Sequence, residues 1–413
     1  MTSLPLASFD ELDELDFADP RLHAERDLTE VWRRLRAERP FHRQSARGAQ
    51  PAFWVITRYA DAVEVYRGRD FTSGQGNALP TLLTGGDTDA GTTLAVTDGP
   101  RHQQIRSILT RAFSPRVLAA LQEGVRRTVD ELMAAAVARG EADFVRDVSA
   151  HLPLGAVCDL LDVPRGDRQY LLGLASRTWR SGDADAPPED SWTAESEILL
   201  YFADLARTRR GGDGDDVVSL LADCRIDGEP LSDAELMANC HGLMTGGDET
   251  GRHAVSGGLL ALIENPEQWE ALRSGTLNLR TAADEVLRWT APSLHGGRTA
   301  TVDVEVNGQP IRAGEIVSAW IASANRDGDV FPDPDRFDLT RTPNRHLAFA
   351  SGAHHCLGHL LARAEIEAVL DSLRRMVSDV RQTAPETWIR SSVLHGMKTL
   401  PVTFEADPAG LSP

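Results

Sequence analysis

Cys356 stands in the stretch of the chain whose residue types are best suited to chemistry. It lies in FASGAHHCLG, residues 349–358, directly before a run with helical spacing of apolar residues. A thiol at the start of a helix faces the positive end of the peptide dipole, and amide hydrogens of a tight loop can point at its sulfur. Gly352 and Gly358 let the backbone approach something flat and bulky, and Phe349 could cover the sulfur and exclude water. These features predict that Cys356 is a metal ligand.

Three interpretations of this cysteine remain open at the level of the residues. A single cysteine is often a small buried hydrophobe. Zinc could use the three histidines nearby, but a structural zinc site needs a second ligand pair, and the other three cysteines offer none at suitable spacing. Haem held by one cysteinate needs a single sulfur, an apolar shell and scattered cations for its two propionates.

The residues from Phe349 to Gly358 resemble the haem-binding loop of the soluble bacterial cytochrome P-450 monooxygenases. The family pattern is Phe-Gly-x-Gly-x-His-x-Cys-x-Gly, and this chain departs from it at Ala350, where glycine is usual. The resemblance implies haem b (heme b, iron protoporphyrin IX) as the cofactor, with Cys356 as the metal ligand and Phe349 and Gly358 beside it. The alanine could alter the loop's hydrogen bonds to the sulfur.

Composition narrows the class of protein. The 413 residues are 41% hydrophobic and 25% charged, which is ordinary for a globular protein. A formal charge of -19 argues against general nucleic-acid binding. Four cysteines without a recognisable disulfide framework suit a reducing compartment, and the chain shows neither a signal-peptide pattern nor an apolar run of membrane-spanning length. We expect a cytoplasmic protein that binds neither nucleic acid nor membrane.

A long helix is predicted upstream of the cysteine loop. Ser232-Asp-Ala-Glu235 is a capping box, and the apolar run that follows should last until Asn265, about 33 residues or roughly 50 Å. The glycines in its centre, residues 245–251, each cost about 1 kcal/mol relative to alanine, so we expect a local distortion there that admits water or a small molecule.

The residues beside those glycines could move protons. Glu249 and Thr250 could relay a proton to an oxygen species in the groove. The alternative is a helix packed closely on a neighbour, with Glu249 at the surface. In the family this pattern lies over the haem where dioxygen binds, which implies catalytic roles for Glu249 and Thr250 and a place beside the cofactor for Gly247.

Cations for two propionates are the next requirement of a haem site. Asp98 is a predicted cap for a helix on which His102 and Arg106, four residues apart, share one face. A solvated basic edge is the alternative. The resemblance implies propionate contacts from four residues, His102, Arg106, Arg298 and His354.

Glu285 and Arg288 are three residues apart, so they share a helix face. A surface ion pair of at most about 1 kcal/mol is the usual meaning of such a pair. Here the pair resembles the family's Glu-x-x-Arg motif, which is buried and completed by a second arginine, for which Arg341 stands at the matching place. Its role is structural.

The resemblance covers residues 30–405 and implies the fold class: mainly α with a small β lobe, the cytochrome P-450 fold, with a long central helix crossing over the haem. We expect a loosely ordered lead-in over residues 1–27 and a single catalytic domain over 28–413. Val304 to Val317 should contain a hairpin turning at Asn307-Gly308. The glycine-rich segment 71–93 is predicted to be a mobile binding loop.

The implied reaction is monooxygenation, in which one oxygen atom of O2 enters a C–H bond or a double bond. A sizeable natural product such as a polyketide or peptide scaffold is the expected substrate, and a terpenoid, a fatty acid or a carrier-bound aminoacyl group are alternatives. The expected pocket residues are Leu243, Leu294, His295, Gly296, Val393 and Leu394.

Electrons should come from a ferredoxin, served by its reductase. A ferredoxin would dock on the side of Cys356, and the candidate basic contacts there are Arg101, Arg111, Arg116 and Arg363. A peroxide-driven haem enzyme and a non-catalytic haem sensor or carrier are the rival hypotheses.

Overall fold

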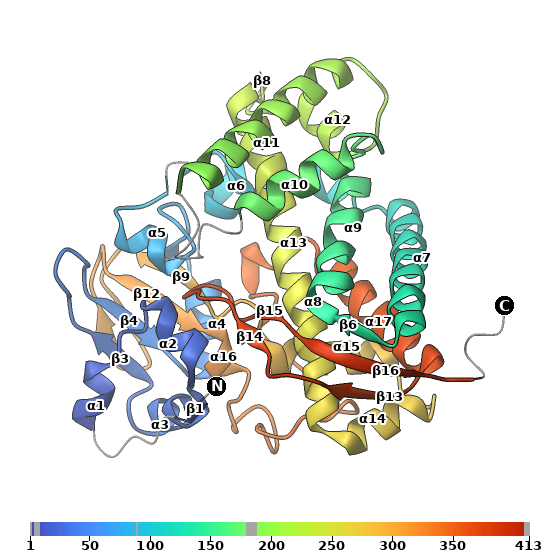
Figure 1. The fold of residues 1–413 in the computed structure, drawn as a ribbon. Coiled ribbons are helices and arrows are strands. Elements are labelled where there is room, and N and C mark those ends of the chain that lie inside the picture. The colour runs from blue at the N-terminus through green and yellow to red at the C-terminus, as the bar shows by residue number, and fades with distance from the viewer. Residues whose placement is uncertain (1, 4–8, 88–89, 179–187, 409–413) are drawn as a thin grey trace.

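The computed structural model describes residues 2–3, 9–87, 90–178 and 188–408. A helical region and a smaller β lobe make up the described chain, and the long helix α13 (Asp233–Glu264) runs between the two (Figure 1). The fold class expected from the sequence is therefore confirmed. Among the described residues we find no helix that is both long and apolar enough to cross a membrane.

The helices fall mainly in the middle of the chain. The other α-helices are α1 (Phe9–Glu14), α2 (Pro20–Glu25), α3 (Thr29–Glu38), α4 (Tyr59–Arg67), α5 (Leu79–Leu83), α6 (Gly99–Arg111), α7 (Pro115–Arg139), α8 (Phe144–Asp147), α9 (Leu152–Leu160), α10 (Arg168–Thr178), α11 (Pro188–Arg209), α12 (Val217–Ala222), α14 (Pro266–Arg273), α15 (Leu279–Thr290), α16 (Ile321–Ala324) and α17 (His359–Met376). Short 3-10 turns lie at Leu94–Val96, Ser149–His151 and Gly352–His354.

The largest sheet has the strand order β3-β4-β12-β9-β5, built from β3 (Phe41–Gln44), β4 (Phe53–Ile56), β12 (Ile316–Trp320), β9 (His295–Ala300) and β5 (Phe71–Thr72). A three-stranded sheet joins β13 (Val377–Gln382), β16 (Pro401–Ala406) and β6 (Glu141–Asp143). The remaining strands form pairs: β1 (Thr2–Ser3) with β2 (Arg26–Asp27), β7 (Arg225–Ile226) with β8 (Glu229–Pro230), β10 (Val304–Val306) with β11 (Gln309–Ile311), and β14 (Thr387–Trp388) with β15 (Met397–Thr399).

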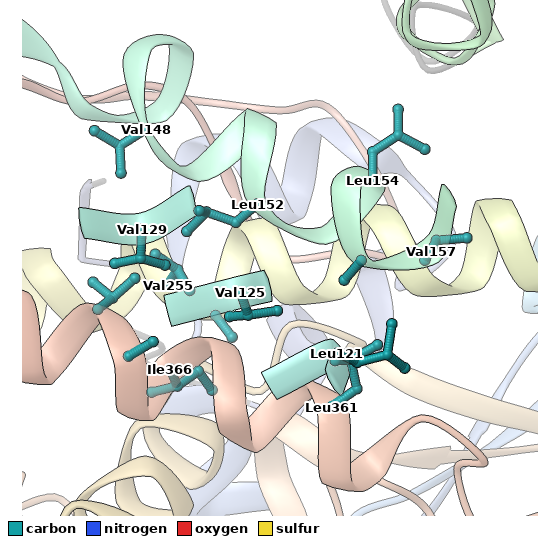
Figure 2. Close-up of a cluster of buried hydrophobic side chains, with 14 of the residues drawn as sticks. Leu121, Val125, Val129, Val148, Leu152, Leu154, Val157, Val255, Leu361 and Ile366 are labelled. Atoms are coloured by element: carbon teal, nitrogen blue, oxygen red, sulfur yellow. The ribbon is translucent and has the colours of Figure 1, made fainter. Parts of the chain in front are cut away.

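The main hydrophobic core lies where α7, α9, α13 and α17 meet. Helix α7 contributes Leu121, Val125 and Val129 at four-residue spacing, which places them on one face. Figure 2 shows them together with side chains from α9, α13 and α17, including Val255 and Ile366. This core fixes the position of α13, which carries Thr250, and of α17, which follows Cys356.

A second core lies under the β lobe, and the N-terminal segment contributes to it. Leu12 and Phe17 are fully buried there, and the Phe17 ring centroid lies 5.2 Å from that of Trp32. The described part of residues 1–27 thus packs against the lobe and is not loosely attached, because its apolar side chains cover the sheet. The single catalytic domain over 28–413 stays a prediction.

Local signals gave the predicted elements at the expected places. Ser232 and Glu235 form the capping box of α13, and the helix ends at Glu264 before Pro266. The hairpin of β10 and β11 turns at Asn307 and Gly308, whose φ angles of 47° and 81° are both left-handed. The segment 71–93 is more ordered than expected: β5 and α5 lie within it, while residues 88–89 are outside the described part.

Candidate functional site

A cavity of about 520 Å³ lies between the middle of α13, the loop before α17 and strand β9. Most of the residues predicted for the cofactor and substrate line it: Arg106, Leu243, Gly247, Thr250, His295, Gly296, Arg298, Phe349, His354, Cys356, Gly358 and Val393. The sequence motifs, which are spread over nearly 300 positions, therefore converge on one space. His102, Glu249, Leu294 and Leu394 do not line it.

The cysteine loop is a tight turn. The Cys356 amide donates to the Phe349 carbonyl at 3.0 Å, and the His355 amide donates to the Gly352 carbonyl at 3.1 Å. A Cβ at Gly352 would lie 2.8 Å from the Tyr66 carbonyl oxygen, and its φ is +78°, so only glycine fits. Ala350 has a φ of +55°, which means that this chain carries an alanine in a left-handed position.

The thiol of Cys356 lies in a partly buried residue at the cavity. Burial raises the pKa of the Cys356 thiol, while the backbone N–H of Gly358 and the charges of Arg106 and Arg363 act to lower it. Desolvation thus outweighs the effect of the loop's amides, contrary to the simple expectation of a thiolate. A bound metal cation would reverse this balance, because coordination deprotonates a thiol.

Four cationic or imidazole groups gather at one end of the cavity. Arg106 donates to the His355 carbonyl at 2.6 Å, and the buried Arg298 donates to the Gly297 carbonyl at 2.7 Å. Each guanidinium has five N–H donors, so both keep donors for a carboxylate. Burial lowers the pKa of Arg298 from its very high ordinary value. A guanidinium is not deprotonated in proteins, so this arginine stays charged.

The two histidines of this group pack on one another. The rings of His102 and His354 lie 4.3 Å apart, and burial, followed by the charge of His354, lowers the pKa of His102 to about 4. His102 Nε2 is buried without a hydrogen-bond partner among the described residues. In the tautomer that carries the proton on Nε2, this unpaired nitrogen can donate to a carboxylate, as the two arginines can, which agrees with haem propionates.

Asp98 does not cap α6, although the helix begins where the sequence predicted. Its carboxylate lies 2.8 Å from His354 Nε2 and accepts hydrogen bonds from the Thr72 hydroxyl and the Ser73 and Gly74 amides. Burial alone would raise the pKa of Asp98, but these hydrogen bonds hold it well below its usual range. The carboxylate therefore fixes the orientation of His354, a contact between distant segments.

Helix α13 passes the cavity without interruption. The distortion predicted at residues 245–251 is absent, and the Thr250 hydroxyl donates to the Gly246 carbonyl at 3.4 Å. A Cβ at Gly247 would lie 2.6 Å from Val157, and one at Gly251 would lie 2.7 Å from the Glu365 carboxylate. Close packing against α9 and α17 thus accounts for Gly247 and Gly251, whereas a Cβ at Gly246 would meet nothing within 4 Å. The alternative interpretation is met only in part, because Glu249 is not at the surface.

Glu249 points away from the cavity. Its carboxylate lies 3.6 Å from the Arg252 guanidinium, and burial raises the pKa of Glu249 to about 8, although Arg252 acts to lower it. Thr250 lines the cavity, whereas Glu249 is not among the lining residues. The expected direct relay between the two side chains is therefore not present in this arrangement.

Glu365 of α17 is a cavity residue that the sequence analysis missed. It is buried, it lines the cavity, and burial together with the charge of Asp248 raises the pKa of Glu365 to about 8. The signal available was its spacing: it lies four residues after Leu361, another lining residue, and so shares its helix face.

Comparison with known proteins identifies the family. A family model described as cytochrome P450 matches residues 277–376. Cytochrome P450 NovI of Streptomyces niveus is 57% identical over 403 residues, which cover 97% of this chain and 99% of that protein. The chain belongs to the cytochrome P450 family.

Two further relatives agree with this assignment. A methyl-branched lipid omega-hydroxylase of Mycobacterium bovis (strain ATCC BAA-935 / AF2122/97) is 37% identical over 85% of this chain and 84% of its own length. The crystal structure of P450 OxyD, which is involved in the biosynthesis of vancomycin-type antibiotics, has a TM-score of 0.87 at 33% identity and covers 95% of this chain and all of that one. The chain is therefore a P450 monooxygenase, and haem is its cofactor.

The P450 holds its cysteine loop on a buried ion-pair network. Glu285 accepts from Arg288 at 2.8 Å and from Arg341 Nε at 3.1 Å, and Glu285 and Arg288 are fully buried. The two arginines also donate to the backbone carbonyls of Asn325, Pro332, Asp333, Pro334 and Arg336. The structural network expected from the sequence is present, and it ties down the chain between β12 and the cysteine loop.

One wall of the cavity is formed by two segments that lie side by side, residues 292–296 and 393–396. Leu294 N–H donates to the Val393 carbonyl at 2.9 Å, and Ser293 and Leu394 form an antiparallel bridge. Side chains of extended strands alternate between faces, so Ser293 and His295 line the P450 cavity while Leu294 packs on the other side. Val393 of the second segment also lines the cavity. Leu294 was therefore wrongly predicted as a pocket residue, and Leu394 does not line the cavity either.

Proposed function

We propose that this P450 inserts one oxygen atom of O2 into a C–H bond, or a double bond, of a small-molecule natural product, as a tailoring step on a polyketide or peptide scaffold. The observation that carries the site assignment is that Cys356 and Thr250, from the loop before α17 and from α13, line one cavity. The substrate class is supported by the likeness to P450 OxyD, which is involved in the biosynthesis of vancomycin-type antibiotics.

In this proposal the chain's own residues hold the cofactor and manage protons. Cys356 would bind the iron, and Arg106, Arg298, His102 and His354 would bind the propionates. When bound, haem supplies the redox chemistry that activates dioxygen.

Thr250 would offer its hydroxyl to the part of the cavity where dioxygen would bind. Its present hydrogen bond, to the Gly246 carbonyl at 3.4 Å, is long and therefore weak. Glu249 has a pKa of about 8, so it carries a proton at neutral pH, and in this proposal it would donate that proton to the cavity after leaving its contact with Arg252. This motion replaces the direct relay inferred from the sequence.

The cysteine assignment has a direct test. Reduced wild-type protein treated with carbon monoxide should show the far red-shifted Soret band of sulfur-ligated haem, and Cys356→Ala should lose it together with substrate oxidation. Cys224→Ala is the matched control, because Cys224 is a free cysteine that does not line the cavity. An unchanged band in Cys356→Ala would refute the assignment.

The substrate proposal needs a screen. Free polyketides and peptides, a terpenoid, a fatty acid and a carrier-bound aminoacyl group should be compared by the spin shift that they induce, followed by product analysis. A spin shift and a hydroxylated product only with the terpenoid or fatty acid would overturn the proposal.

A ferredoxin is the proposed electron donor. Among its candidate contacts Arg101 pairs with Glu235, Arg116 pairs with Asp215, and Arg363 lies 2.6 Å from Asp284, while Arg111 is exposed. Arg111→Glu should therefore reduce the rate of electron transfer more than Arg363→Gln. Turnover with peroxide alone and none with ferredoxin would favour the peroxide-driven rival, and haem binding without reductant consumption would favour a sensor.

A further inference from the structure

A second cavity of about 360 Å³ lies behind the wall of the substrate cavity. It is enclosed by the N-terminal segment around α2 and α3, the second half of α13, the end of α15, and the strands β14 and β15. The two cavities share no lining residue among those described, because the wall of residues 292–296 and 393–396 separates them. Leu294, His395 and Gly396 face the second cavity from this wall.

Flat aromatic groups make up much of its lining. Trp388 is stacked on His395 with ring centroids 4.6 Å apart and an interplanar angle of 17°. The Arg326 guanidinium lies 4.0 Å from the centre of the Trp289 ring, and Trp32 closes a third side. Surfaces of this kind favour a planar, mainly apolar occupant, since aromatic rings pack best on flat faces.

A buried histidine in this lining lacks hydrogen bonds. His253 is 2% exposed, and neither of its ring nitrogens has a hydrogen-bond partner in the described part of the chain. Burial, followed by the charge of Arg252, lowers the pKa of His253 to about 3, so the ring is neutral and offers one donor and one acceptor. Leaving both unpaired in the interior is costly, so the site favours a ligand with a matching polar group.

The position of the His253 ring requires glycine at residue 396. A Cβ at residue 396 would overlap the His253 ring, although the backbone there is not left-handed. The glycine is thus required by the histidine and not by a turn. His253 belongs to α13 and packs against Gly396, with its ring at the cavity.

The charged groups at the cavity are mostly matched. Arg326 lies 3.5 Å from Asp335, and Glu386 accepts from Gln382 and Trp388. Glu264, which also lines the cavity, has its pKa raised by burial, which favours the neutral acid. A neutral ligand therefore fits better than an ion.

We propose that this cavity is a second ligand site, which takes a neutral planar aromatic molecule bearing an N–H or O–H group that donates to His253. The site goes beyond the monooxygenase reaction, because its occupant would lie behind the substrate wall and not against the cysteine loop. Indole is a suitable probe, and 1-methylindole is its counterpart without the donor.

The test uses the haem-loaded protein with the substrate cavity blocked by 4-phenylimidazole, an azole that coordinates haem iron. Calorimetry or ligand-observed NMR should show indole binding with an affinity that the azole changes by less than about threefold. Indole should bind about fivefold more tightly than 1-methylindole, the value of one neutral hydrogen bond. In His253→Phe this preference should vanish.

His295→Phe is the matched control, since it removes a buried imidazole from the other face of the wall and should keep the preference for indole. Ala261→Phe, which fills the second cavity from α13, should abolish indole binding and covers the case that His253→Phe fails to fold. Displacement of indole by the azole, an unchanged preference in His253→Phe, or no binding at all would overturn the proposal.

Discussion

Glu285→Gln should destabilise the protein far more than loss of a surface carboxylate. The Glu285 carboxylate is fully buried, and it accepts five hydrogen bonds: Oε1 from Arg288 Nη2 and the Asp338 amide, and Oε2 from Arg288 Nε, Arg341 Nε and Asn344 Nδ2. A glutamine keeps one acceptor oxygen and turns an NH2 group toward at least two of these donors.

The size of the effect follows from that count. Two hydrogen bonds to a charged acceptor are lost, and the two buried arginines lose their counter-charge, which together cost about 3 to 5 kcal/mol. Since native proteins are stable by roughly 5 to 15 kcal/mol, much of the margin disappears. Arg288 and Arg341 also hold the segment before the cysteine loop, so haem retention should fall as well.

Equilibrium urea unfolding followed by tryptophan fluorescence, with the carbon monoxide spectrum as a second probe, measures this loss. Glu367→Gln is the control, because Glu367 pairs with Arg280 at 3.4 Å on the surface and should cost at most about 1 kcal/mol. If Glu285→Gln is too unstable to isolate, Arg341→Lys tests the same network at a smaller cost. A loss in Glu285→Gln no larger than in Glu367→Gln would refute the reasoning.

Three further perturbations test individual residues. Ala350→Gly should raise the free energy of unfolding by about 1 kcal/mol, because it removes a left-handed alanine, and an unchanged or lower urea midpoint would contradict this. Thr250→Ala should lower the product formed per electron consumed without loss of haem. Thr245→Ala should not, because the Thr245 hydroxyl donates to the His241 carbonyl and Thr245 does not line the cavity. Equal coupling in the two variants would argue against a role for Thr250. His253 has a folded pKa of about 3, below its unfolded value near 6.5, so its stabilising contribution is present above pH 6.5 and is lost as the pH falls. Between pH 7 and pH 5 this loss amounts to about 2 kcal/mol, and His253→Phe should show that much less acid destabilisation than wild type in urea titrations at the two pH values; parallel losses would disprove the assignment.

Structural features that depend on residues close together in the chain could be predicted from the sequence. The Ser232 to Glu235 capping box, the Asn307-Gly308 turn and the pairing of Glu285 with Arg288 each depend on residues within a few positions of one another. Their geometry follows from backbone stereochemistry and helix periodicity, which act locally. The order of the haem loop and its supporting motifs likewise indicated the family before any fold was known.

Orientation across distant segments was decided by the tertiary structure. Asp98 is bound by His354 and the loop at 72–74 and does not cap its helix, and Glu249 pairs with Arg252 instead of facing the cavity. The alternation of the wall strands sends Leu294 away from the substrate side. The contacts of Asp98 and the packing of Leu294 depend on segments that are distant in the sequence, whereas Glu249 and Arg252 are three residues apart on one helix, and only the fold decides which way that pair faces.

The sequence by itself determined which residues could bind haem and which long helix would cross the site. Only the folded chain decided which faces of those elements meet, because pairing between segments hundreds of residues apart depends on packing that no local pattern specifies. The buried Glu365 beside the middle of α13 and the second cavity at His253 both arise from such contacts.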